Sequence, residues 1–384
     1  MSGSDFAAQS RLAKVEAIHV RVPFRRPLLD ATGEFTHRRS WLLRVVDGDG
    51  HEGLGEAALN PVAEDVTTGA LARLMREIVP ALAGGRRPSW SELAAEGEPG
   101  RAAMAAVEGA LGALEAARDA TGSIPASPPT QIPVSATIAF SGPDAGADAA
   151  AQAIELGFQT LKLRAGFERS TDQLVDRLRA LRAAVGPEPR LRIDAAGAWD
   201  LETATERIAA IESFRIEYVE QPLTAWDLIG HAALRERVRV PIALDESVDS
   251  EGAARAALAE GAAEVIVVKP VRVGGMAATL RIVEAASARG ASVVLGTYFE
   301  TGVGIAAALR IAAALGNERT PGRSAGRSVG REPAHGLATA GLLAHDLLAV
   351  PLSVEKGRMA VPPQVRLDEQ EVDRYTIERF EAHG

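Results

Sequence analysis

Short apolar runs recur through the middle of the chain, and stretches with apolar residues at helical spacing separate them. Four of these runs, at 190–194, 216–220, 241–245 and 264–269, each end in a charged residue, about 25 residues after the previous one, at Asp194, Glu220, Asp245 and Lys269. The runs are rich in β-branched residues, which favour strands. The intervening stretches, such as 201–211 and 251–260, have the periodicity of helices. This alternation predicts a parallel (β/α)8 barrel.

The same alternation extends the barrel in both directions. We expect strands one and two at 134–140 and 160–164, with a helix at 145–156 between them. Strand seven is predicted at 292–297, and a short strand eight near 335–339. Because the carboxyl ends of parallel strands converge on one mouth of a barrel, the charged residues that end the runs should lie around a single pocket.

The first third of the chain follows a different pattern, in which polar and apolar residues alternate as in antiparallel strands. Strands are predicted at 14–22, 40–47 and 51–56, and Ala/Leu/Glu-rich helices at 65–82 and 101–121. Together they predict an α+β domain that precedes the barrel.

Three regions are therefore expected. Residues 1–130 form the α+β domain, 131–350 form the barrel, and 351–384 pack back on the N-terminal domain. A Pro/Ser-rich stretch at 124–133 marks the first boundary. The Gly/Arg/Pro-rich stretch 316–336 is interpreted as a surface loop in preference to a phosphate or nucleic-acid patch.

Composition narrows the function. The chain has 384 residues, 47% of them hydrophobic, a formal charge of −9 and a pI near 5.5, which argues against nucleic-acid binding. There is no cysteine, so disulfides, thiolate metal sites and cysteine nucleophiles are excluded. No signal-like or membrane-spanning apolar stretch is found, and we expect a cytoplasmic protein that acts on small molecules.

Asp194, Glu220 and Asp245 offer only hard oxygen donors, and no histidine clusters with them. Such donors favour Mg²⁺ over zinc. Any one of these acids alone would be interpreted as an exposed strand end or a helix cap. Three acids at the same phase of the repeat would repel one another strongly unless a cation lay among them, so a metal site is predicted.

Basic residues are expected on the same rim. Lys269 precedes Pro270, which ends its strand and places the lysine at the mouth. Beside a cation and in a partly dry pocket, such a lysine can act as a base. The alternative is a structural salt bridge from Lys269 to Asp245 or Glu246. Lys162 and Arg164 lie two apart on one strand and should both face the mouth.

These residues carry a resemblance to a known family. It is carried by Lys162-Leu163-Arg164, Asp194, Tyr218 to Pro222, Leu244 to Ser247, and Lys269-Pro270 followed by Gly274-Gly275. Together with Gly53-Leu54-Gly55-Glu56, they resemble the enolase superfamily, muconate-lactonizing subgroup. The resemblance implies a (β/α)7β-type modified TIM barrel with an N-terminal α+β capping domain, whose loop at 23–39 closes over the pocket. It also implies that Asp194, Glu220 and Asp245 bind Mg²⁺ and that Lys269 is one of two lysines flanking the substrate.

Within this subgroup, further segments are similar to those of o-succinylbenzoate synthases: 299–304, 334–339, and Arg25 to Leu28 with Arg38-Arg39. By this resemblance Glu300 and Arg26 are candidate substrate-binding residues, and Gly296 and Thr297, at the end of predicted strand seven, are expected to line the pocket with them. Dipeptide epimerases of the subgroup usually carry Asp-x-Asp at strand eight, where this chain has Ala338-Thr339-Ala340.

The chain departs from the family pattern at two positions. The second lysine of the family's Lys-x-Lys is Arg164 here, and a guanidinium does not readily release its proton. Ala196 stands where relatives often have Asn beside the first metal ligand. We therefore expect Lys269 to transfer the proton, while Lys162 and Arg164 stabilise negative charge.

The expected reaction is Mg²⁺-dependent abstraction of a proton α to a carboxylate through an enediolate, followed by dehydration to o-succinylbenzoate in menaquinone synthesis. The alternatives are a muconate cycloisomerase, an N-acylamino-acid racemase or a dipeptide epimerase of the same subgroup. A barrel that binds carboxylate and metal without turnover is a further alternative. The expected partner is a small carboxylate, with no nucleic acid or membrane, and a homo-oligomer is left open.

Overall fold

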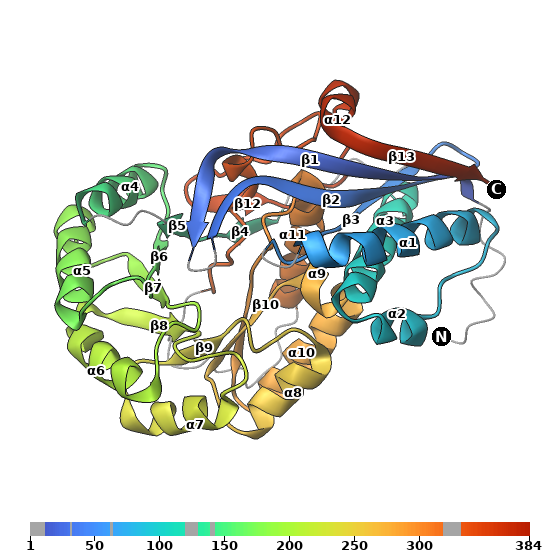
Figure 1. Cartoon of the computed structure of the whole chain (residues 1–384). Helices are drawn as coiled ribbons and strands as arrows, with labels where there is room; N and C mark the ends of the chain where they lie inside the picture. The colour runs from blue at the N-terminus through green and yellow to red at the C-terminus, as the bar shows by residue number, and fades with distance from the viewer. Residues whose placement is uncertain (1–11, 31–32, 62–63, 120–129, 139–142, 318–331) are drawn as a thin grey trace.

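A computed structural model describes residues 12–30, 33–61, 64–119, 130–138, 143–317 and 332–384. Two sheets organise the molecule. One is a four-stranded antiparallel sheet in the order β13-β1-β2-β3, and the other is a seven-stranded parallel sheet in the order β11-β10-β9-β8-β7-β6-β5. Figure 1 shows the parallel sheet curling into a barrel with helices outside it, and the antiparallel sheet extending away from it.

The barrel strands are short and follow one another in chain order across the sheet. They are β5 (Ala136–Ile138), β6 (Thr160–Arg164), β7 (Arg190–Asp194), β8 (Ile216–Glu220), β9 (Ile242–Leu244), β10 (Val265–Val268) and β11 (Ser292–Leu295). Parallel strands need a crossover between them, and helices supply it. These are α4 (Pro143–Glu155), α5 (Thr171–Val185), α6 (Leu201–Ile211), α7 (Leu228–Arg237), α8 (Glu251–Ala259), α9 (Pro270–Val273), α10 (Met276–Ala288) and α11 (Gly302–Asn317).

The predicted fold class, a modified TIM barrel with an N-terminal α+β domain, is confirmed. The predicted eighth strand near 335–339 is wrong in its extent, because it is reduced to a single parallel bridge between Val134 and His335. The His335 amide donates to the Pro133 carbonyl, and the Gly336 amide donates to the Leu295 carbonyl. This short segment therefore closes the gap between β11 and the beginning of the barrel.

The N-terminal domain is built from β1 (Leu12–Asp30), β2 (Gly33–Asp47), β3 (Glu52–Ala57), α1 (Glu64–Ala83), α2 (Trp90–Ala95) and α3 (Gly97–Asp119). The first two strands are much longer than predicted. The segment expected to be a loop at 23–39 instead continues β1 and β2 as a hairpin, with a register shift between Pro23 and Leu28. Phe24 of this hairpin forms an antiparallel bridge with Leu343, so the hairpin contacts the barrel.

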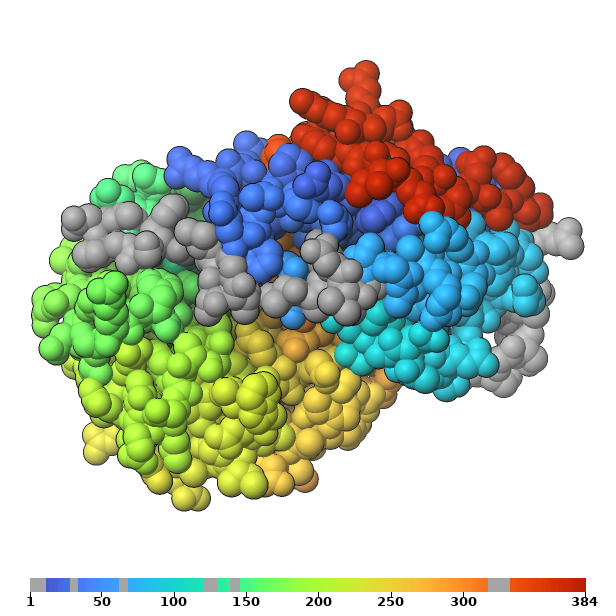
Figure 2. All heavy atoms as spheres, viewed as in Figure 1, coloured from blue at the N-terminus to red at the C-terminus, as the bar shows by residue number. Residues whose placement is uncertain are grey.

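The C-terminal residues add a strand to the N-terminal sheet. After β12 (Arg358–Ala360) and α12 (Glu369–Tyr375), β13 (Thr376–His383) pairs antiparallel with β1. Figure 2 shows these C-terminal residues, in red, lying against the N-terminal strands, in blue. In the described part of the chain, no helix is long and apolar enough to cross a membrane.

Candidate active site

Three acidic residues meet at the carboxyl ends of neighbouring strands. Asp194 is the last residue of β7, Glu220 is the last residue of β8, and Asp245 directly follows β9. Asp194 pairs in register with Glu220, and Glu220 with Ala243. The three acids are only 1%, 1% and 4% exposed. The repeat seen in the sequence thus becomes a row of three buried carboxyl groups.

Two lysines flank this row. Lys162 lies on β6 and Lys269 directly follows β10, so the strand order puts one amine on each side of the three acids. Lys162 Nζ lies 2.8 Å from Asp194 Oδ2 and 2.7 Å from Glu220 Oε1. Lys269 Nζ donates to both carboxylate oxygens of Asp245. The chain has only four lysines, and two of them are at this rim.

Two arginines complete the set of charges. Arg164 Nη1 lies 2.7 Å from Asp194 Oδ2, on the same side as Lys162. Arg272 lies 3.5 Å from Asp245 Oδ1 and donates to the Asp245 and Glu246 carbonyls. The salt bridge from Lys269 to Asp245, which the sequence left open as an alternative, is therefore present.

The carboxyl groups differ in their affinity for protons. Burial alone would raise the pKa of Asp194, but Lys162 and Arg164 outweigh it and hold that pKa well below the usual range. Burial raises the pKa of Glu220 to about 8, with Lys162 opposing and Asp194 and Asp245 adding to the rise. Burial and the neighbouring Asp245 raise the pKa of Glu246 to about 7. The basic groups therefore leave negative charge at this rim incompletely compensated.

The donor set suits a divalent cation. All three candidate ligands are carboxylates, the donors that Mg²⁺ prefers. Glu246 Oε2 is buried and has no hydrogen-bond partner among the described residues, as expected where positive charge is in deficit. Lys162 already bridges Asp194 and Glu220, which shows that a cationic group fits between them. The residues present thus fit a metal ion held by Asp194, Glu220 and Asp245.

A second group, Asp47, Asp49 and His51, also brings ligand atoms close together. Its geometry is that of a turn. Asp47 Oδ1 accepts hydrogen bonds from the Asp49 and His51 amides, and Asp47 Oδ2 lies 3.1 Å from His51 Nδ1 and accepts from Arg118 Nε at 2.8 Å. These contacts hold the turn between β2 and β3, so the group has a sufficient structural role.

The backbone beside Asp194 shows how the site tolerates Ala196, one of the two departures from the family pattern. Ala196 has φ 49°, in the left-handed region, and its amide donates to Asp194 Oδ1 at 3.2 Å. Asparagine adopts this conformation more readily than alanine does. The amide contact to Asp194 does not depend on the side chain, so it is retained with alanine at this position.

The four candidate substrate-binding residues do not all lie beside the acidic row. A side chain at Gly296 would approach Lys269 Cγ to 3.6 Å, so this glycine borders the lysine. Thr297 Oγ1 lies 2.9 Å from Thr339 Oγ1 and links β11 to the segment that closes the barrel. Glu300 is buried next to Glu56 of the N-terminal domain. Arg26 lies exposed on β1, and its role stays a prediction.

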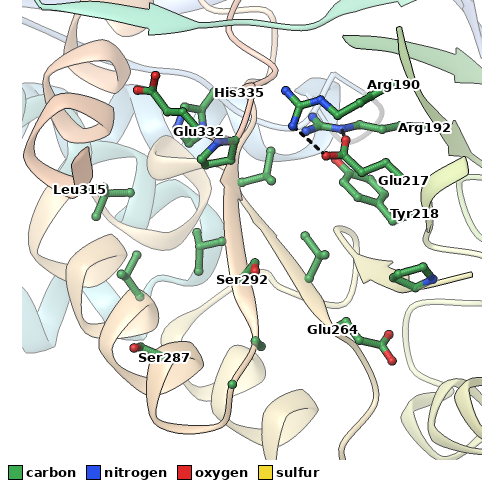
Figure 3. Close-up of a pocket in the computed structure, with 18 of the residues that line it drawn as sticks. Arg190, Arg192, Glu217, Tyr218, Glu264, Ser287, Ser292, Leu315, Glu332 and His335 are labelled. Atoms are coloured by element: carbon green, nitrogen blue, oxygen red, sulfur yellow. Dashed lines mark hydrogen bonds and ion pairs between the residues drawn. The ribbon is translucent and has the colours of Figure 1, made fainter. Parts of the chain in front are cut away.

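A cavity of about 820 Å³ lies at the other end of the barrel (Figure 3). It is lined by residues at the start of the strands, including Arg190, Ile216 and Ser292, rather than by the strand-end acids. Two of its arginines are already paired, since Arg190 Nη1 lies 3.0 Å and Arg192 Nε 2.6 Å from the oxygens of Glu217. The cavity is therefore separate from the candidate active site.

Sequence reasoning missed Tyr298, and it considered Glu246 only as an alternative salt-bridge partner of Lys269. Glu246 carried a signal, because it directly follows the candidate ligand Asp245. Tyr298 carried none, because its contact with Lys269 depends on how the segment after β11 folds back on the strand ends.

Comparison with known proteins identifies the family to which the chain is similar. Residues 145–367 match the family described as Enolase C-terminal domain-like. An o-succinylbenzoate synthase of Geobacillus kaustophilus is 31% identical over 376 residues, which cover 94% of both chains. An o-succinylbenzoate synthase of Thermobifida fusca is 42% identical over 187 residues, 48% of this chain and 56% of that protein. An L-Ala-D/L-Glu epimerase of Clostridium acetobutylicum is 34% identical over 46% of this chain and 50% of that protein.

The fold has solved counterparts. The muconate lactonizing enzyme of Pseudomonas fluorescens superposes with a TM-score of 0.77 at 23% identity, over 96% of this chain and 99% of that chain. A probable mandelate racemase of Alicyclobacillus acidocaldarius gives a TM-score of 0.76 at 26% identity, over 97% of this chain and 99% of that chain. With a family match over more than half of its length and a full-length relative above 30% identity, this chain belongs to the enolase superfamily.

Proposed function

We propose that this chain removes the proton α to the carboxylate of a small acid and stabilises the resulting enediolate. The observation that carries the proposal is the row of three buried acids on successive strand ends, with a lysine on each side. A divalent cation held by Asp194, Glu220 and Asp245 would supply Lewis-acid stabilisation of the negative charge on the substrate carboxylate.

The basic residues take different roles in this proposal. Arg164 keeps its proton, since guanidinium groups stay charged in proteins. Burial would lower the pKa of Lys162, but Asp194, Glu220 and Asp245 outweigh it, so the pKa is raised and this lysine also stays cationic. Both groups therefore stabilise developing negative charge. Lys269 is left as the proton carrier, at the opposite side of the row.

The most specific form of the proposal is dehydration to o-succinylbenzoate. Lys269 takes the α-proton of a hydroxycyclohexadiene carboxylate and passes this proton to the departing β-hydroxyl, which leaves as water, and the ring becomes aromatic. The full-length relative from G. kaustophilus carries the name of this synthase, which supports the assignment. The absence of Asp-x-Asp at 338–340 disfavours a dipeptide epimerase.

A second candidate is racemisation of an N-acylamino acid. It is favoured by the two amines on opposite sides of the acidic row, because inversion needs a proton donor on one face and an acceptor on the other. The raised pKa of Lys162 suits a donor better than an acceptor. Racemisation would be recognised by deuterium entering from solvent at the α-carbon of an N-succinylamino acid with loss of optical purity.

The test compares substrates and variants in one assay. The wild type is incubated, with Mg²⁺ or with EDTA, with the hydroxycyclohexadiene carboxylate, cis,cis-muconate and an N-succinylamino acid. We expect turnover of the first substrate only, and only with Mg²⁺. Lys269→Ala should lower kcat by about 10²- to 10⁴-fold, Arg164→Ala by less, and Lys14→Ala, away from the rim, should match the wild type. If Lys269→Ala stays active while Arg164→Ala is inactive, the assignment of the base is wrong.

A further inference from the structure

Tyr298 lies in the segment between β11 and α11, beside the candidate base. Its side chain is buried at 6% exposure, and its amide donates to Glu300 Oε2 at 2.8 Å. Lys269 Nζ lies 5.0 Å from the centre of the Tyr298 ring. The guanidinium carbon of Arg272 lies 5.7 Å from the same centre. Both cations are within the range of about 6 Å over which an aromatic face attracts positive charge.

The other contacts of Tyr298 belong to the N-terminal domain. Tyr298 and Val271 are barrel residues, yet they pack in a hydrophobic cluster formed by buried residues of β1, β2, α1 and α3. That cluster includes Trp41, Met75 and Leu114. Tyr298 therefore packs in the core of the N-terminal domain, while its ring contacts Lys269 and Arg272 at the candidate active site of the barrel.

This contact matters because the side-chain hydrogen bonds of Lys269 that the structure describes all go to one charged anchor. That anchor is Asp245, whose two oxygens accept hydrogen bonds from Lys269 Nζ. Asp245 is also a candidate cation ligand, so a bound cation would compete with the lysine for the negative charge of this carboxylate. The ring of Tyr298 uses no ligand atom, so its contact with the lysine is independent of that competition.

We propose that Tyr298 is a positioning residue, which is itself anchored in the hydrophobic cluster of the N-terminal domain and holds Lys269 against the acidic row. The kinetic part of this inference rests on the proposed function of Lys269. The geometric part does not, because it concerns where the lysine lies. A lysine side chain has four flexible torsions, and a ring that restricts them would raise the fraction of time in which the amine faces the substrate.

The variants separate the ring from the volume that it fills. Tyr298→Phe keeps the ring and removes only the hydroxyl. Tyr298→Met removes the ring and keeps an apolar side chain of useful length, and Tyr298→Leu is the second ring-free variant if the methionine variant does not fold. Leu114→Ala is the matched control, because it loosens the same hydrophobic cluster without touching Lys269.

Kinetics on the substrate that the wild type turns over provide the first readout. We expect kcat of the ring-free variant to fall about tenfold, which corresponds to the loss of one good cation–π contact. KM, and the Kd for Mg²⁺ measured by calorimetry, should change less than about threefold, because Tyr298 contributes no ligand atom. Tyr298→Phe should retain wild-type kcat. Leu114→Ala should lower the melting temperature and leave kcat unchanged. Equal kcat in the phenylalanine and ring-free variants would overturn the proposal.

The second readout needs no activity. With only four lysines in the chain, protein labelled with ¹³C-lysine gives a simple spectrum, in which Lys269→Arg assigns the Lys269 signal. Protons near the face of a ring are shifted by its ring current. The Lys269 ε-methylene signal should therefore be displaced in the wild type and in Tyr298→Phe, and return to the position of an exposed lysine without the ring. A wild-type signal that is not displaced would refute the contact. A displaced signal in a protein that turns over none of the substrates would support the contact and refute the proposed function.

Discussion

At the scale of single residues, Asp194 and Glu220 show how the position of a carboxyl group in the row determines its pKa. They are in-register neighbours on β7 and β8 and share Lys162. Asp194 has Arg164 as well, and its pKa is lowered, whereas the pKa of Glu220 is raised to about 8. The acid in the middle of the row therefore experiences the repulsion of both neighbours. A cation would relieve Glu220 more than it relieves Asp194.

Stability against pH tests this difference. Because the folded-state pKa of Glu220 is about 8, above its ordinary value of 4.5, the folded protein keeps a proton that the unfolded chain releases. Stability is then highest below the ordinary value and falls as the pH rises through about 8, by at most about 1.4 kcal/mol per pH unit. Glu220→Gln should flatten this fall in EDTA, as measured by melting temperature from pH 5 to 9. At pH 8.5, Mg²⁺ should raise the melting temperature of the wild type much more than that of the variant.

The control for this experiment is Glu260→Gln, which changes an exposed glutamate at the end of α8. It should reproduce the wild-type dependence on both pH and Mg²⁺. If Glu220→Gln gains as much from Mg²⁺ as the wild type does, Glu220 is not a ligand.

At the scale of elements, the barrel strands that carry the acids were the most predictable. The predicted strands 190–194 and 216–220 and the helix 201–211 are confirmed to the residue, because apolar runs closed by a charge leave little freedom in the boundary. The hairpin at 23–39 was missed, since the extra length of β1 and β2 comes from pairing with each other and not from alternation in the sequence. Strand eight was overestimated for the same reason, as its length depends on both neighbours.

The site divides in a similar way. The sequence identifies the three acids and Lys269 as one set, because each of them ends or directly follows a periodic strand, and it adds Lys162 through the face that this lysine shares with Arg164 on β6. The sequence does not predict the role of Tyr298 or the burial of Glu300, because both depend on how the N-terminal domain packs on the loop after β11. Contacts between distant segments have no local signature.

One such contact joins β3 to the start of α11. Glu56 of β3 accepts hydrogen bonds from the Thr301 amide at 3.0 Å, the Thr301 hydroxyl at 2.6 Å and the Gly304 amide at 2.9 Å. The carboxylate thereby serves amides at the beginning of a helix in the other domain, where negative charge is favourable. The three hydrogen bonds tie the N-terminal domain to the segment that also contains Tyr298.

Removal of this carboxylate should be costly. At pH 6, Glu56→Ala leaves two buried donors and one partly buried donor without their acceptor, and we expect the free energy of unfolding to fall by about 2 to 4 kcal/mol. Urea denaturation measures the change. Glu52→Ala, on the same strand but in a partly exposed pair with Arg44, should cost less than about 1 kcal/mol. Equal losses from the two variants would show that the Glu56 contacts do not hold the domains together.

At the scale of the whole molecule, the two domains meet around a second buried acid. Glu300 is 4% exposed. Burial raises its pKa to about 7, Glu56 adds to the rise, and Arg38 opposes it. The groups belong to both domains, with Arg38 on β2 and Glu56 on β3 facing the loop after β11. Ionisation of Glu300 therefore places two like charges at the junction on which the position of the N-terminal domain depends.

Glu300→Gln should make the molecule less sensitive to pH. The folded-state pKa of about 7 exceeds the ordinary 4.5, so wild-type stability is greatest below about 4.5 and declines as the pH rises through about 7. Glutamine mimics the neutral form, and at pH 8 the variant should be more stable than the wild type by at most roughly 3 kcal/mol, with little difference at pH 4.5. Urea denaturation at both pH values measures this. Glu300 lies away from the acidic row, so the gain should be the same with Mg²⁺ and with EDTA, unlike the effect of Glu220→Gln. Parallel pH curves for wild type and variant would mean that the junction does not resist ionisation, and a gain that disappears with Mg²⁺ would place Glu300 at the metal site instead.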